Sequence, residues 1–322
     1  MSDLTVLVLA RPDDPGLRRL ERLPGGVRAV VGGRFDDLAE AAPQADVLLY
    51  CSAGGRKLLE QAWQAAPRIR WVHSRPAGVD VVLFPALVES AVPVTNSRGV
   101  FSRSLAEFVL AGVFFFAKDI PRMRRGQAAG RWDPFQPEMV RGRTLGIVGY
   151  GDIGRETARV ARAVGMRVVA LRRQPSAAGD DLADEIVGPE RLHELLGRAD
   201  YVVIATPLTA ETRHLIGREA LAAMPPHAVV INVGRGPVVD EAALIEALEQ
   251  QRIRGAALDV FEQEPLPDGH PLYRLDNVLL SPHCADQTAG WQAEAMDVFL
   301  ENLERFRAGQ PLRNLVDKSR GY

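Results

Sequence analysis

A glycine-rich segment in the middle of the chain has the spacing of a phosphate-binding turn. Gly149, Gly151 and Gly154 form a G-x-G-x-x-G pattern between an apolar run over 144–149 and a predicted helix over 153–164. The first glycine suits a tight turn, the second lets a pyrophosphate approach the backbone, and the third lets the helix pack on the strand. Because a helix N-terminus offers free N–H groups and a positive dipole end, the segment predicts a dinucleotide site.

The two residues that follow Gly151, namely Asp152 and Ile153, are expected to contact the cofactor through their backbone. Ile153 begins the predicted helix, so its N–H should point toward the phosphates. Asp152 suits the positive end of the helix, but its carboxylate would have to turn away from a pyrophosphate. We therefore expect Asp152 to contact the cofactor through its backbone N–H.

The end of the next predicted strand, 167–171, bears on which dinucleotide binds. An NAD-selective fold usually has an acidic residue there, whereas this chain has Arg172 and Arg173. A carboxylate would repel the 2′-phosphate of NADP, but a guanidinium can bind it with two hydrogen bonds. We therefore expect NADP to be preferred, with NAD as a second cofactor. The alternative is that the two arginines are simply solvated surface residues.

Composition narrows the class of protein. The chain has 322 residues, 47% hydrophobic and 25% charged, which is typical of a soluble globular protein with room for two domains. A net charge of −2 gives no indication of a nucleic-acid partner. Two cysteines, Cys51 and Cys284, make no disulfide framework and suit a reducing cytoplasm. The first residues show no basic region and no signal cleavage site, so no secretion signal is expected, and the most apolar predicted helix, 105–117, is too short to span a membrane.

Apolar runs alternate with helical stretches along the whole chain. The runs are continuous rather than alternating, which indicates strands covered on both faces and hence parallel sheets. The chain is therefore predicted to be α/β, with two doubly wound parallel-sheet domains. The predicted strands are 5–10, 28–31, 46–50, 69–73 and 92–95 in the first set, and 144–149, 167–171, 200–205, 228–233, 255–259 and 277–280 in the second. A helix beginning near Ser102, with Ser104 and Glu107 as a capping box, is expected after the first set.

Three residues suited to acid–base and anion chemistry follow predicted strands of the second set. They are Arg235, Glu264 and His283, and ligands of open α/β sheets bind beyond such strand ends. Around them the chain resembles the D-isomer-specific 2-hydroxyacid dehydrogenases, which include glyoxylate/hydroxypyruvate reductases and D-3-phosphoglycerate dehydrogenase. The resemblance covers nearly the whole chain and lies in segments that keep the family's order: HSRPAGVD, NSRGVFSRSLAEFVL, RTLGIVGYGDIG, TPLTAETRHLIG, INVGRGPVVDEAAL, ALDVFEQEPLP and LLSPHCA.

The resemblance implies a role for each of the three residues. Arg235 would bind the substrate carboxylate and orient the 2-oxo group, a task that suits a planar donor. His283 would be the general acid that protonates the 2-oxo oxygen, and the general base in the reverse direction. Glu264 would hydrogen-bond the imidazole and raise its pKa.

The resemblance also assigns binding positions. Ala77 and Gly78 match the turn whose backbone N–H groups receive the substrate carboxylate, and Asp259 matches the acceptor for the nicotinamide carboxamide. The remaining cofactor-binding positions are Thr206 and Pro207 beneath the adenosine and Val233 near the nicotinamide.

A Rossmann nucleotide-binding domain over 98–287 is expected to be inserted in a flavodoxin-like substrate domain of 1–97 and 288–322.

Three features lie outside these assignments. Arg75 stands where the family usually has a small or uncharged residue, so it either reaches the pocket and selects a polar or doubly charged substrate, or forms a plain salt bridge. Cys284 is not expected to be a nucleophile, because neighbours in an extended segment point to opposite faces. The histidines, cysteines and acidic residues show no metal-ligand spacing, so no metal site is expected.

The expected activity is NADP-dependent reduction of a small 2-oxo acid, glyoxylate or hydroxypyruvate. A D-3-phosphoglycerate dehydrogenase-like enzyme is one alternative, and a nucleotide-sensing corepressor on the same scaffold is another. The apolar helix near 114–116 and the loop of Trp132 resemble the family's dimer-forming elements, so a homodimer is expected.

Overall fold

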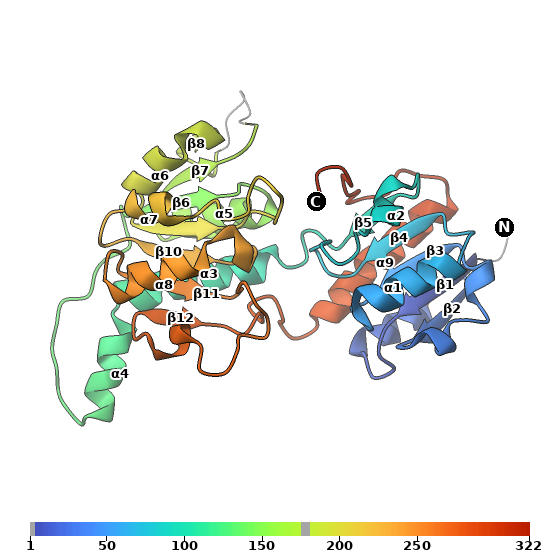
Figure 1. The fold of residues 1–322 in the computed structure, drawn as a ribbon, viewed down its shortest axis with the longest axis horizontal. Helices are drawn as coiled ribbons and strands as arrows, with labels where there is room; N and C mark the ends of the chain where they lie inside the picture. Colours follow the sequence, from blue (N-terminus) through green and yellow to red (C-terminus); the bar gives the residue numbers. More distant parts are fainter. Residues whose placement is uncertain (1–3, 175–180) are drawn as a thin grey trace. The chain divides into compact units, whose positions relative to one another are not determined.

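The computed structural model describes residues 4–174 and 181–322. The chain divides into two compact units (Figure 1). Unit 1 consists of Met1–Val100 and Ala289–Tyr322, and unit 2 consists of Phe101–Thr288. Unit 2 is thus inserted in unit 1 along the chain, with boundaries after residues 100 and 288, against predicted ones after 97 and 287.

Unit 1 is built on a five-stranded parallel sheet in the order β2-β1-β3-β4-β5. Along β1, Leu7 and Leu9 pack into the core on the face that α1 covers, whereas Val6 and Val8 pack with α9 on the other face. Burial on both faces explains why the strands are continuously apolar. The elements are β1 (Leu4–Leu9), β2 (Val27–Gly32), β3 (Val47–Tyr50), β4 (Trp71–Ser74), β5 (Val94–Asn96), α1 (Gly55–Ala65), α2 (Pro85–Glu89), α9 (Trp291–Arg307), and the 3-10 helices η1 (Pro15–Arg22), η2 (Phe35–Asp37) and η3 (Ala42–Gln44).

Unit 2 is built on a seven-stranded parallel sheet in the order β12-β11-β10-β9-β6-β7-β8. The strand order reverses between β6 and β9, and ligands bind beyond the carboxyl ends of strands at such a switch point. The strands are β6 (Thr144–Val148), β7 (Arg167–Leu171), β8 (Glu185–Val187), β9 (Tyr201–Ile204), β10 (Val229–Asn232), β11 (Gly255–Leu258) and β12 (Val278–Leu280). The helices are α3 (Ser102–Ala117), α4 (Ile120–Ala128), α5 (Asp152–Ala163), α6 (Leu192–Arg198), α7 (Arg218–Ala222), α8 (Glu241–Glu249), η4 (Pro189–Arg191), η5 (Gly236–Val238) and η6 (Pro271–Arg274).

The α/β class with two parallel sheets is confirmed, and α3 shows how a sheet face is covered. Its Gly112 lies against the sheet, where an added Cβ would come within 3.0 Å of the Ala257 side chain. No helix in the described part of the chain is long and apolar enough to cross a membrane.

One strand was missed, and one local prediction was wrong. Strand β8 was not predicted, because its three residues are too few to show a period. The capping box on α3 is absent, because the helix begins at Ser102 with Phe101 as its N-cap. Ser104 therefore lies inside the first turn, where its hydroxyl donates to the Ala285 carbonyl, and Glu107 pairs with Arg103 instead.

Candidate active site

The glycine turn after β6 has the geometry that its spacing predicts. Gly149 has a φ of 104°, and a Cβ there would come within 2.7 Å of the backbone at Ala205 and Thr206. At Gly154 a Cβ would come within 2.4 Å of the Gly149 carbonyl oxygen, so α5 packs closely on the turn. Only a glycine fits these two positions.

Gly151 differs from the other two glycines because it faces open space. A Cβ at Gly151 would meet no atom within 4 Å, and the residue is the N-cap of α5. Asp152, exposed, and Ile153, half-buried, form the first turn of this helix, one residue earlier than predicted. The backbone around Gly151 is therefore accessible to a ligand at the positive end of a helix.

The two arginines at the end of β7 are both exposed. Arg172 is held at its backbone, where its N–H donates to the Val187 carbonyl of β8 at 3.0 Å. The Arg173 guanidinium lies 3.6 Å from the Glu211 carboxylate. Both side chains thus stand at the carboxyl edge of the sheet, on the same side of the switch point as the glycine turn.

His283 and Glu264 form a hydrogen-bonded pair. His283 Nδ1 lies 2.6 Å from Glu264 Oε2, and the other carboxylate oxygen accepts from the Phe261 backbone N–H at 2.9 Å. Glu264 is thereby fixed at both oxygens. The loops after β11 and β12 bring these residues together from positions far apart in the chain.

The contact between His283 and Glu264 shifts the pKa of both residues. The hydrogen bond and charge of Glu264 raise the pKa of His283, although burial works against this. Burial disfavours the charged form of Glu264, but the bonds from His283 and Phe261 outweigh it and lower the pKa of that carboxyl. The imidazolium–carboxylate form is therefore favoured.

Asp259 holds the loop that carries His283. Its Oδ1 accepts from the Ser281 hydroxyl at 2.6 Å and from the N–H groups of Cys284 and Ala285 at 3.0 Å. These bonds help to hold His283 at a φ of 51°, a conformation uncommon for a side-chain-bearing residue. The segment is therefore not extended, and the reason given above for dismissing Cys284 was wrong. The Cys284 sulfur lies 3.5 Å from the Ser281 hydroxyl.

Arg235 lies on the loop between β10 and η5. Buried Asn232 shapes this loop, because its side chain donates to the Arg235 carbonyl at 3.1 Å and accepts from the Gly234 N–H at 3.1 Å. A Cβ at Gly236 would come within 1.9 Å of the Phe261 backbone. The Arg235 loop thus packs directly on the segment that leads to Glu264.

In unit 1, Ala77 and Gly78 form part of a turn just after β4. Neither of their N–H groups donates to another group among the residues that the structure describes. Two adjacent unused N–H groups can bind an anion.

Arg75, just before this turn, forms the plain salt bridge. It is 4% exposed, lies 2.7 Å from the carboxylate of Asp14, and donates to the Cys51 carbonyl at 3.2 Å. The guanidinium carbon also lies 5.1 Å from the centre of the Trp291 ring, in a cation–π contact. The side chain links the ends of β4, β3 and β1, so the structure does not favour a role in selecting a doubly charged substrate.

Comparison with known proteins agrees with this arrangement. The family model described as "D-isomer specific 2-hydroxyacid dehydrogenase, NAD binding domain" matches residues 110–285. The chain belongs to the D-isomer specific 2-hydroxyacid dehydrogenase family. It is therefore an oxidoreductase of that family with an NAD(P)-binding Rossmann domain.

Individual relatives extend the similarity to both units. The chain is 38% identical to a glyoxylate reductase of Korarchaeum cryptofilum over 267 residues, 80% of this chain and 79% of that protein. It is 33% identical to a D-3-phosphoglycerate dehydrogenase of Methanocaldococcus jannaschii over 315 residues, 97% of this chain but only 59% of that longer protein. A D-isomer specific 2-hydroxyacid dehydrogenase from Xanthobacter autotrophicus, solved in complex with NADPH and MES, superposes over 100% of both chains with a TM-score of 0.85 and 35% identity.

In the present chain, several buried groups of unit 2 are suited to bind a dinucleotide. The Thr206 hydroxyl, beside Pro207, is buried and has no hydrogen-bond partner among the described residues. Asp259 is 1% exposed, and no described residue donates to its second oxygen, Oδ2. Val233, also buried, ends the run from β10. Together with the open backbone at Gly151, these groups could receive a nucleotide, while each individual contact stays a prediction.

One further titratable residue near the pair was not found in the sequence. Burial raises the pKa of Asp286, with the charge of Asp259 adding to the effect and that of His283 opposing it. Its only signal in the sequence is its place three residues after His283. Among the described residues, no group of three or more histidines, cysteines and acids could hold a metal ion.

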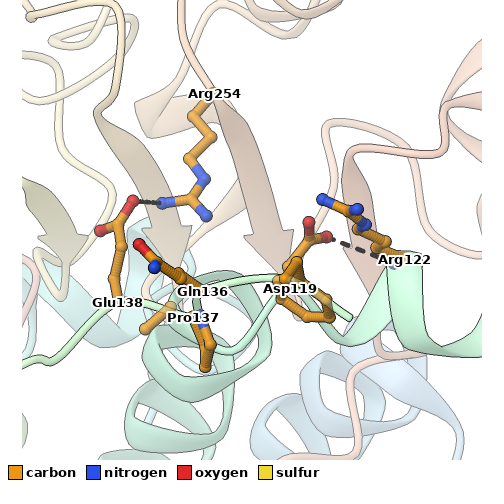
Figure 2. Close-up of a pocket in the computed structure, with 8 residues that line it drawn as sticks. Asp119, Arg122, Gln136, Pro137, Glu138 and Arg254 are labelled. Carbon is orange, nitrogen blue, oxygen red and sulfur yellow. Dashed lines mark hydrogen bonds and ion pairs between the residues drawn. The ribbon is translucent and has the colours of Figure 1, made fainter. Parts of the chain in front are cut away.

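A separate pocket lies at the amino ends of the unit 2 strands (Figure 2). Arg254, directly before β11, lines it and pairs with Glu138 at 2.9 Å. Asp119 accepts from the Arg122 N–H at 3.2 Å, and the Arg122 guanidinium pairs with Asp133 at 2.8 Å. Because Arg254 precedes its strand, this pocket is at the amino edge and is distinct from the site described above.

Proposed function

We propose that this protein is an NADPH-dependent reductase of small 2-oxo acids, with glyoxylate and hydroxypyruvate as substrates, and that it forms the D isomer wherever the 2-hydroxy acid product is chiral. The observation that carries the proposal is the hydrogen bond of 2.6 Å between His283 and Glu264 at the carboxyl edge of the unit 2 sheet. With Nδ1 bound to a carboxylate, Nε2 is left to exchange a proton with a substrate.

The protein's own groups divide the work of the reaction. Bound NADPH would supply the hydride to the 2-oxo carbon. His283 donates its Nε2 proton to the 2-oxo oxygen, and the raised pKa keeps the ring in its acid form. Glu264 accepts from Nδ1 and so fixes the ring's orientation. Arg235 binds the substrate carboxylate and orients the 2-oxo group.

The two units take different partners in this proposal. Unit 2 binds the cofactor through the glycine turn, Thr206, Pro207, Val233 and Asp259, while unit 1 presents the carboxylate turn at Ala77 and Gly78. NADP is preferred because Arg172 and Arg173 stand where an acidic residue would select NAD. Free Cys51 and Cys284 suit a reducing cytoplasm.

We also propose that the protein is a homodimer, assembled through the segment after α4. Trp132 in this segment is 97% exposed and Met139 is 69% exposed, an unusual exposure for such side chains in a monomer. Two contacts hold this segment in place. The Arg122 guanidinium carbon lies 4.6 Å from the centre of the Phe135 ring, and Glu138 forms an ion pair with Arg254, which Figure 2 shows. A rigid support with exposed apolar side chains suits a subunit interface.

A kinetic screen tests the proposed activity. Oxidation of NADPH and of NADH would be followed with glyoxylate, hydroxypyruvate, pyruvate and 3-phosphohydroxypyruvate. We expect the highest kcat/KM with NADPH and glyoxylate or hydroxypyruvate. A preference for 3-phosphohydroxypyruvate would support the phosphoglycerate dehydrogenase alternative. Tight cofactor binding without turnover of any oxo acid would support a nucleotide-sensing protein instead.

A further inference from the structure

Two side chains donate hydrogen bonds to backbone carbonyl groups of the turn at Ala77 and Gly78. The Ser74 hydroxyl donates to the Pro76 carbonyl at 3.0 Å, and the Asn96 side-chain amide donates to the Ala77 carbonyl at 2.6 Å. These carbonyls belong to the two peptide groups whose N–H groups come from Ala77 and Gly78.

Peptide geometry links the two sides of the turn. In a trans peptide the C=O and the N–H point in opposite directions and lie in one plane. A hydrogen bond to the Pro76 carbonyl therefore fixes the direction of the Ala77 N–H, and a bond to the Ala77 carbonyl fixes that of Gly78. We propose that Ser74 and Asn96 are positioning residues that orient these two N–H groups for the substrate carboxylate. This assignment rests on the proposed function of the turn.

Both donors are themselves fixed in place. Ser74 and Asn96 are the last residues of β4 and β5, and they are direct partners in the register of the two strands. Ser74 is fully buried and Asn96 is 8% exposed, so water competes little for their hydrogen bonds. The turn is thus supported from the edge of the sheet.

The Asn96 amide can have only one orientation. Its Oδ1 accepts from the Arg98 N–H at 3.2 Å, which leaves Nδ2 to face the Ala77 carbonyl. The backbone of Asn96 is also bound at both groups, because its N–H donates to the Asn314 carbonyl at 3.3 Å and its C=O accepts from the Asn314 side chain at 3.2 Å. The C-terminal segment therefore helps to hold the donor.

Asn96→Ala and Ser74→Ala test the assignment. Each variant has a matched control that loses a similar bond elsewhere. Asn277→Ala, in unit 2 just before β12, removes an amide that donates to the Leu248 and Arg254 carbonyls, and Ser90→Ala removes a hydroxyl that donates to the Leu87 carbonyl at 2.8 Å. The KM and kcat for the preferred oxo acid, the Kd of NADPH, and the Kd of oxamate on the NADPH-saturated enzyme would be measured for all four variants.

We expect Asn96→Ala to raise the KM and the oxamate Kd about tenfold, and Ser74→Ala to raise them roughly three- to tenfold, since a hydrogen bond to a charged group is at stake. The kcat, the Kd of NADPH and both controls should stay within about twofold of wild type, because a purely structural loss changes the amount of active enzyme and not its affinity. If Asn96→Ala does not fold, Ser74→Ala decides the question.

The outcomes separate this assignment from the proposed function. Wild-type protein that reduces oxo acids, with both variants binding oxamate as well as wild type does, would overturn the positioning role alone. Wild-type protein that neither reduces an oxo acid nor binds oxamate would overturn both the proposed function and the assignment.

Discussion

At the scale of single residues, the proposed chemistry depends on the hydrogen bond between the Glu264 carboxylate and the His283 imidazole. The sequence located His283, Glu264 and Asp259 through their family segments and their places after apolar strands. It could not give the left-handed backbone of His283 or the three hydrogen bonds that Asp259 Oδ1 accepts, because these depend on loops that meet only in the folded chain. For the same reason, the sequence does not decide between the two roles of Arg75, whereas the ion pair with Asp14 in the folded chain does.

The first prediction concerns the proton donor. Glu264→Gln keeps a hydrogen-bonding group but removes the charge that raises the pKa of His283. Reduction needs the acid form, which is lost as the pH rises through this pKa. The fall of kcat/KM at high pH should therefore occur at a lower pH in Glu264→Gln than in wild type.

A second glutamate–histidine pair provides the control for this measurement. Glu262 lies 2.8 Å from His214, so Glu262→Gln removes a similar charge from another imidazole and should leave the pH profile unchanged. His283→Ala should lower reduction by at least ~10²-fold while NADPH binding persists. An unmoved profile in Glu264→Gln would exclude Glu264 from this role.

The second prediction concerns cofactor choice. Replacing both Arg172 and Arg173 by serine removes two guanidiniums at the end of β7. Contacts of this kind contribute about 1.5–3 kcal/mol, so the Kd of NADPH should rise roughly ten- to a hundredfold while that of NADH changes little. Exposed Arg167, at the start of the same strand, is the control, and Arg167→Ser should affect neither cofactor. Equal weakening of both cofactors would mean that the arginines only support the loop.

At the scale of elements, every strand of the two sheets except β8 was predicted from its apolar run, with ends displaced by a few residues. The β5 run, for example, was expected at 92–95 and lies at Val94–Asn96. Strand ends shift because the neighbouring strand decides where pairing stops. The capping box predicted for α3 is absent because Ser104, a good N-cap type, is used for a tertiary bond to Ala285 instead.

The third prediction separates the glycines of one motif. Gly154→Ala should destabilise unit 2 by about 1–3 kcal/mol, because the new Cβ would overlap the Gly149 carbonyl. Gly151→Ala should fold normally, since its Cβ would meet no atom within 4 Å, yet bind NADPH more weakly because the methyl occupies the cofactor's approach. Denaturant unfolding and NADPH titration would measure the two effects. Unweakened NADPH binding by Gly151→Ala would contradict a pyrophosphate at this turn.

At the scale of the whole molecule, the insertion of one unit in the other was predicted together with the family resemblance, with boundaries within three residues of those in the structure. The fourth prediction concerns assembly. The protein should sediment as a homodimer at micromolar concentration, and Trp132→Ser should shift it toward monomer because an aromatic anchor is lost. Tyr273, 56% exposed elsewhere in unit 2, is the control, and Tyr273→Ser should remain dimeric. A wild-type monomer at micromolar concentration would contradict the interface.

The central claim is that the whole chain reduces a 2-oxo acid to the D isomer with hydride from NADPH. The most direct test is chiral analysis of the product after hydroxypyruvate is incubated with the purified protein and NADPH. The account predicts D-glycerate in an amount equal to the NADPH oxidised. Formation of L-glycerate, or no oxidation of NADPH with any small 2-oxo acid, would contradict it.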